Sequence, residues 1–180
     1  MADGLDVFGV VAAAVVFPTL FAAGCHHLLR TGGLARVLRL HGWPAALSRP
    51  GAWLVAVAET GIGAAGLAGV ALTGVHPAVA FAAAALCGAY AIDAARLVRS
   101  GARETPCGCG AVDHPVNVWV AVRAAAYAGL AIVAALTAPA VGDLGPVAAV
   151  TAAGAAVAIG LPLWLLPRTL AIPAGFTLRP

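Results

Sequence analysis

The sequence contains no lysine, and all ten of its positively charged residues are arginines. Charged residues of both signs make up only 9% of the 180 residues, whereas an average soluble protein carries about 25%. A chain with so few charges is poorly suited to a surface that faces water on all sides. The net charge of +3 is spread over several segments, which excludes the clustered basic face of a nucleic-acid-binding protein, and we expect no nucleic-acid partner.

Positive charge is also missing from the N-terminus, where Asp3 and Asp6 are the charged residues before the first apolar stretch. A secretory signal peptide begins with Lys or Arg, so we expect this stretch to remain part of the protein. The four cysteines, two of which lie within apolar stretches, do not match the disulfide framework of a small secreted protein.

Hydrophobic residues make up 62% of the chain and form long runs. A helix needs about 20 mostly apolar residues to cross a hydrocarbon core that is roughly 30 Å thick. Five stretches reach this length, at residues 7–29, 52–72, 78–97, 118–138 and 147–166. Because lipid cannot satisfy backbone polar groups, such stretches form helices. We therefore predict an all-α fold: a polytopic membrane helical bundle in a lipid bilayer, built as a single domain with a four-helix core and a fifth helix.

The second stretch contains four glycines, at Gly61, Gly63, Gly66 and Gly69. Small residues allow helices in a membrane to approach closely, so these glycines predict tight helix packing. We favour this interpretation over a phosphate-binding loop, because no strand precedes the glycines.

Arginines alternate between the segments that join the apolar stretches. They occur in residues 30–49, in residues 96–103 and in the C-terminal tail, but not in the N-terminus, in residues 74–77 or near residue 143. Cytoplasmic loops carry an excess of arginine, so we predict an inner or plasma membrane protein with its N-terminus outside and its C-terminus in the cytoplasm. Within residues 30–49, leucines and valines alternate with Arg36 and Arg39, which is compatible with a short interfacial helix and equally with a polar connector.

The strongest local pattern is a Pro-Cys-Gly-Cys-Gly run at residues 106–110, inside a cysteine loop that we place at residues 104–116. The glycine between Cys107 and Cys109 permits a tight turn that brings their sulfurs together. A disulfide in so small a ring is strained and easily reduced, which suits thiol–disulfide exchange better than structural stapling. Two thiolates also bind a soft metal, so the pattern alone leaves both functions open.

Cys25, His26 and His27 follow one another at the predicted cytoplasmic end of the first stretch. Histidine exchanges protons near neutral pH and binds metals, so these residues are candidates to act together with the cysteine loop. His114, near the end of that loop, could join them. Cys87 lies near the middle of the third stretch, and we interpret it as a small core residue.

Three ionisable residues lie inside predicted spans, namely Glu59, Asp93 and Arg123, each towards the cytoplasmic end. Such residues are costly in hydrocarbon and usually face the bundle interior, where they are paired or functional. A structural ion pair of Arg123 with Glu59 or Asp93 is compatible with these positions, and so is a catalytic role. Polar groups gathered at one end of an apolar bundle predict a functional site there. The predicted site comprises Cys25, His26, His27, Glu59, Asp93, Cys107, Cys109, His114 and Arg123.

The chain resembles the MauE family of methylamine utilisation proteins, within the wider MauE/DoxX group of redox-associated membrane proteins. The resemblance covers roughly residues 5–138 and rests on the Cys107-Gly108-Cys109 loop, Glu59, Arg123 and the Trp43-Pro44 end of the first loop. The family usually has a phenylalanine after the second cysteine and often a lysine near the end of the first span. This chain instead has Gly110 at the first position and two histidines at the second.

The resemblance implies a helical bundle tied to thiol or disulfide redox chemistry, often alongside thioredoxin-like partners. In the founding system of the family, such a protein supports maturation of a disulfide-rich periplasmic enzyme subunit. Our first hypothesis is therefore a membrane thiol-redox protein in which Cys107 or Cys109 attacks a partner disulfide and the other cysteine resolves the mixed disulfide. The electron partner is a thioredoxin-like protein or a quinone.

Within this hypothesis Glu59, His26 or His27 accepts and returns protons, and Arg123 favours the thiolate or orients Glu59. Two other functions stay open. One is a non-catalytic assembly factor, and the other is copper or zinc handling at a metal site. The metal ligands would be Cys25, His26, Cys107, Cys109 and His114.

The redox hypothesis conflicts with the predicted location of the cysteine loop. Disulfides normally form outside the cytoplasm, whereas the arginine pattern places the cysteine loop inside.

Overall fold

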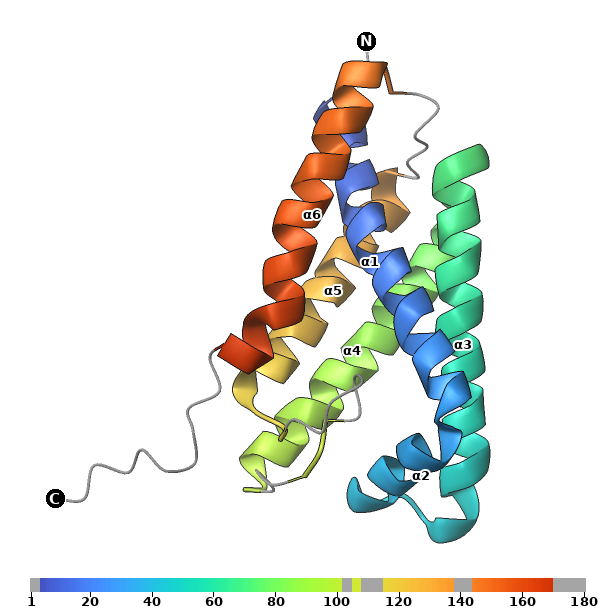
Figure 1. Ribbon diagram of the computed structural model, residues 1–180, viewed down its shortest axis with the longest axis vertical. Helices are drawn as coiled ribbons and strands as arrows, with labels where there is room; N and C mark the ends of the chain where they lie inside the picture. The colour runs from blue at the N-terminus through green and yellow to red at the C-terminus, as the bar shows by residue number, and fades with distance from the viewer. Residues whose placement is uncertain (1–3, 102–104, 108–114, 138–143, 170–180) are drawn as a thin grey trace, which may run out of the picture.

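The computed structural model describes residues 4–101, 105–107, 115–137 and 144–169 (Figure 1). These residues form helices and no strand, which confirms the predicted all-α class for the described part of the chain. An isolated bridge between Pro106 and Pro115 joins the two described sides of the cysteine loop. The helices are α1 (Gly4–Leu29), α2 (Thr31–Leu40), α3 (Ala45–Leu72), α4 (Pro77–Arg99), α5 (Val118–Thr137) and α6 (Pro146–Thr169).

Five of these helices, all except α2, are long and apolar enough to cross a membrane. This agrees with the prediction of a polytopic bundle of five spans. The largest difference in bounds is at α3, which begins at Ala45 rather than at residue 52 and runs through Pro50. Membrane helices tolerate an internal proline when neighbouring groups compensate for the lost hydrogen bond. Arg49 stays exposed, so the extra turns add no buried charge.

The segment between the first two spans is a helix rather than an irregular connector. Leu34, Ala35 and Val37 of α2 are buried, and α2 packs against α3. Arg36 and Arg39 lie on the exposed side of the same helix. This division into an apolar and a charged face is typical of a helix that lies along a membrane surface.

The core of the bundle is built around α1, which contacts α3, α5 and α6 (Figure 1). In its most apolar 18-residue window, 56% of α1 is buried, compared with 33% or less in the other spans. The charge-free run from Val7 to Leu29 therefore reflects burial inside protein as well as contact with lipid. The buried residues that α1 adds to the core are Val10, Val11, Ala12, Ala13, Val15, Val16, Phe17 and Leu20.

Glycines bring α1 and α3 into close contact. A Cβ atom on Gly66 would overlap the ring of Phe17, and one on Gly63 would overlap the backbone of Phe21. These contacts confirm the packing interpretation for both residues. Gly61 has open space around it, so it does not contribute to this contact.

The connections that carry arginines gather at one end of the bundle, shown at the bottom of Figure 1. This end holds α2, the start of α3, the end of α4, the described parts of the cysteine loop and the start of α5. The turn from α3 to α4 belongs to the other end, where His76 Nδ1 accepts a hydrogen bond of 3.3 Å from Ala78 N. The bundle therefore collects its cysteine loop and its polar helix ends on a single side.

Candidate functional site

Glu59 of α3 is the most deeply buried ionisable residue of the site, with 2% of its surface exposed. Its Oε2 lies 2.6 Å from Nδ1 of His27, which comes from the last turns of α1. The hydroxyl of Tyr90 on α4 donates a hydrogen bond of 2.7 Å to Oε1. Both carboxylate oxygens are therefore occupied, as a buried charge requires. The Glu59 side chain therefore links α1, α3 and α4 through a histidine and a tyrosine.

A second polar cluster holds the cysteine loop. His41, directly after α2, places Nδ1 2.6 Å from Oδ2 of Asp93, and its Nε2 lies 3.0 Å from the carbonyl oxygen of Pro106. Arg96 donates to Oδ1 of Asp93 at 3.0 Å and to the carbonyl oxygen of His41 at 2.7 Å. Because Pro106 precedes Cys107, this cluster fixes the position at which the chain enters the loop.

Cys107 is half-buried and packs against a small apolar cluster at the junction of α4 and α5. Beyond the loop, the Val116 N–H donates a hydrogen bond of 2.9 Å to the carbonyl oxygen of Thr105. Together with the bridge between Pro106 and Pro115, this closes the base of the loop. Local backbone pairing and the His41 contact therefore place Cys107 against the bundle.

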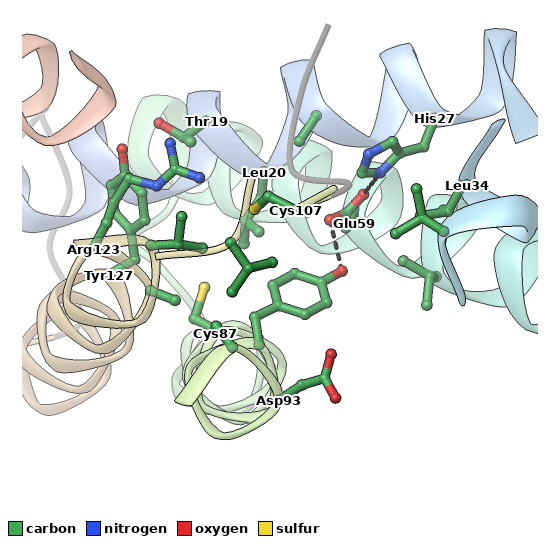
Figure 2. A pocket seen from close by; sticks show the side chains of 18 of the residues that line it. Thr19, Leu20, His27, Leu34, Glu59, Cys87, Asp93, Cys107, Arg123 and Tyr127 are labelled. Carbon is green, nitrogen blue, oxygen red and sulfur yellow. Dashed lines mark hydrogen bonds and ion pairs between the residues drawn. The ribbon is translucent and has the colours of Figure 1, made fainter. Parts of the chain in front are cut away.

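The two clusters and Cys107 border one cavity of about 120 Å³ (Figure 2). Its polar or sulfur-bearing lining residues come from α1, the end of α2, α3, α4, the loop, α5 and α6. They are Thr19, His27, His41, Glu59, Cys87, Tyr90, Asp93, Cys107, Arg123, Tyr127 and Trp164. The remaining lining residues are apolar, so the cavity wall is mainly apolar and carries a limited number of polar groups.

The cavity has two polar ends, which Figure 2 shows on opposite sides of the view. His27 and Glu59 form one end. Arg123 and Tyr127 of α5 form the other, beside Thr19 of α1. The Arg123 guanidinium carbon lies 5.9 Å from the ring centre of Trp164, within reach of a cation–π interaction.

The structure brings together some of the predicted site residues and not others. His27, Glu59, Asp93, Cys107 and Arg123 line the cavity. Two further predicted residues, Cys25 and His26, do not line it. The rings of His26 and His27 do meet edge to face, with centroids 6.0 Å apart. The predicted Cys109 and His114 lie outside the described residues. Cys87 is buried in the core, as predicted, and also borders the cavity.

The predicted ion pair of Arg123 with Glu59 or Asp93 is wrong for the residues that the structure describes. Glu59 pairs with His27, and Asp93 pairs with His41 and Arg96. The reason is the direction in which each helix face points: both carboxylates meet the α1 and α2 side of the bundle, whereas Arg123 meets Trp164 of α6.

Although two of them left a helical signal, sequence reasoning missed five polar lining residues: Thr19, His41, Tyr90, Tyr127 and Trp164. Tyr90 precedes Asp93 by three positions and Tyr127 follows Arg123 by four, so each shares a helix face with a residue that was singled out. His41 and Trp164 left no such signal, because their partners are distant in the chain.

The predicted metal site stays a prediction, because two of its ligands, Cys109 and His114, lie outside the described residues. Within residues 4–101, 105–107, 115–137 and 144–169, no three His, Cys, Asp or Glu side chains converge as metal ligands.

A comparison with protein families matches residues 5–138 to the family described as methylamine utilisation protein MauE. The search of curated proteins and the search of solved structures found no match.

Proposed function

The chain belongs to the MauE family of membrane proteins, and we propose that it is a thiol–disulfide redox protein whose reactive pair is Cys107 and Cys109. The observation that supports this most is the shared cavity. Cys107 borders the same small space as the buried His27–Glu59 pair, although the three residues come from widely separated parts of the chain. A thiol and a buried acid–base pair that line one cavity suit thiol exchange, because the thiolate is the attacking form.

The proposed exchange follows the usual two steps. The thiol of Cys107 or Cys109 transfers its proton to the His27–Glu59 pair, and the resulting thiolate attacks the disulfide of a partner protein. The second cysteine then breaks the mixed disulfide, so that the partner is reduced and Cys107 and Cys109 become disulfide-bonded. The same steps in reverse oxidise a partner dithiol and return Cys107 and Cys109 to thiols. Arg123, a positive charge on the same cavity, favours the thiolate. A thioredoxin-like protein or a quinone exchanges electrons with the pair.

Orientation in the membrane is part of the proposal. The arginine-bearing connections lie at the end that carries the cysteine loop, and arginine excess marks the cytoplasmic side. We therefore place the loop and the C-terminus in the cytoplasm of an inner or plasma membrane. A C-terminal reporter that is active on only one side of the membrane tests this placement.

Trapping of thiols in growing cells tests the redox function. Cells are quenched in acid, and free thiols are labelled with a maleimide large enough to shift the protein on a gel. We expect a reductant-sensitive change in Cys107 and Cys109, lost in Cys107→Ser and in Cys109→Ser. Cys25→Ser is the matched control, because it removes a thiol that does not line the cavity.

Two results would reject the proposal. One is that Cys107 and Cys109 keep a single redox state under oxidising and reducing growth conditions. The other is that the purified protein holds stoichiometric copper or zinc that the Cys107→Ser, Cys109→Ser double variant loses, which would assign the pair to a metal site instead.

A further inference from the structure

The second polar end of the cavity presents hydrogen-bond donors without matching acceptors. The Tyr127 hydroxyl is buried and makes no hydrogen bond to any described residue, although Thr19 lies beside it. Only 7% of Tyr127 is exposed. The Thr19 hydroxyl donates its hydrogen to the carbonyl oxygen of Val15 at 2.8 Å, and its oxygen does not form a hydrogen bond with the Tyr127 hydroxyl.

Arg123 adds a charged donor at the same end. Within the described residues no carboxylate lies within ion-pairing distance of its guanidinium group, and its described partner is the Trp164 ring. A cation–π contact holds the group in place but leaves its N–H donors available. Hydrogen-bond donors that lack acceptors are unfavourable in an apolar cavity. This end of the cavity is therefore suited to a ligand with acceptor oxygens.

The rest of the cavity limits the shape and polarity of that ligand. Its volume of about 120 Å³ is close to the roughly 150 Å³ of an engineered apolar cavity that holds one benzene molecule. Leu20, Ala94, Val120 and Ala124 contribute apolar walls. The site therefore fits a single six-membered ring that carries oxygen at its edge.

We propose that this cavity binds a lipid-soluble quinone, with one carbonyl oxygen accepting hydrogen bonds from the Tyr127 hydroxyl and the Arg123 guanidinium. Cys107 borders the same cavity, so the ring would lie within the space that connects the donors to the reactive sulfur. A fatty-acid carboxylate also fits the donors, but it cannot accept electrons from thiols.

The role of the quinone as an electron acceptor rests on the proposed thiol function, in the direction in which a partner dithiol is oxidised and returns Cys107 and Cys109 to thiols. As the sulfur–sulfur bond between Cys107 and Cys109 forms, the two thiols lose two electrons and two protons. The two carbonyl oxygens of the quinone gain them, and the product is the quinol. The His27–Glu59 pair at the opposite end of the cavity can accept and return one of these protons during the transfer.

Binding of duroquinone to the full-length protein in detergent micelles tests the site. The ring of this probe is fully methylated, so it does not form adducts with thiols, and quenching of tryptophan fluorescence reports its binding. We expect Tyr127→Phe to weaken binding about fivefold, through one lost hydrogen bond, and Arg123→Gln about tenfold, through a charged one. Thr137→Val, which removes a hydroxyl from the same helix outside the cavity, should leave the affinity about unchanged.

The outcomes separate this inference from the proposed function. Equal affinities of the wild type, Tyr127→Phe and Thr137→Val would overturn the quinone site, as would tighter binding of oleate than of duroquinone. Absence of duroquinone binding, with Cys107 and Cys109 still cycling in cells, would overturn the site and leave the thiol function standing. Binding that depends on Tyr127, in a protein whose cysteines never change redox state, would support the site and reject the thiol function. Tyr127→Phe keeps the test decisive if Arg123→Gln does not fold.

Discussion

Replacement of Glu59 by alanine removes the carboxylate that joins three helices. In the native protein its oxygens lie 2.6 Å from His27 Nδ1 and 2.7 Å from the Tyr90 hydroxyl, and only 2% of the residue is exposed. Loss of one partner of a buried pair costs about 3–5 kcal/mol, because the other partner is left unmatched. We expect Glu59→Ala to lower the free energy of unfolding by about 3 kcal/mol, at the lower end of that range, since polar contacts in membrane proteins are often weaker.

A double-mutant cycle with His27→Ala isolates the pair. Costs that come from lost methylene groups and from other neighbours cancel in the cycle, and the remaining coupling energy belongs to the contact. We expect a coupling of about 1–3 kcal/mol, with the double variant less destabilised than the sum of the single variants. Unfolding of the purified protein by SDS in mixed micelles, followed by far-ultraviolet circular dichroism, measures each free energy. Additive effects within error would refute the coupling.

Three further outcomes follow from the contacts of other residues. His41→Ala removes the hydrogen bond to the Pro106 carbonyl, so maleimide should label Cys107 about three to ten times faster, and an unchanged rate would show that the contact does not restrain the loop. Gly66→Ala places a Cβ against an aromatic ring of α1 and should lower the unfolding free energy by about 1–3 kcal/mol. Gly61→Ala, its control on the same helix, has open space and should change it by less than about 0.5 kcal/mol, so similar losses in both variants would contradict the packing account.

Much of the fold could be predicted because membrane helices leave a strong one-dimensional signal. Each span exceeds the length that crosses a bilayer, and few charges interrupt it. The start of α3 was misplaced because Arg49 and Pro50 are typical of a loop, whereas here they occupy the first turns of a helix. Hydropathy identifies a segment that avoids water, but it does not locate the first residue of the helix.

The candidate site was predictable only in part. Glu59 stands out as an acidic residue in an apolar run, but its partner depends on which way its helix faces. Arg123 lies at a similar depth, yet His27 is the residue that reaches Glu59. The contact between His41 and Asp93 joins residues 52 positions apart, and no local sequence pattern predicts it. Helical spacing would have pointed to Tyr127.

The central claim is that the His27–Glu59 pair governs the reactivity of Cys107, and the alkylation rate of the reduced, purified protein tests it most directly. Mass spectrometry reads the maleimide labelling of Cys107 over time, with Cys25 as an internal reference outside the cavity. The account predicts that Glu59→Gln slows labelling of Cys107 by about tenfold or more while the Cys25 rate is unchanged, because the proton acceptor is lost. Equal labelling rates of Cys107 in the wild type and in Glu59→Gln would contradict it.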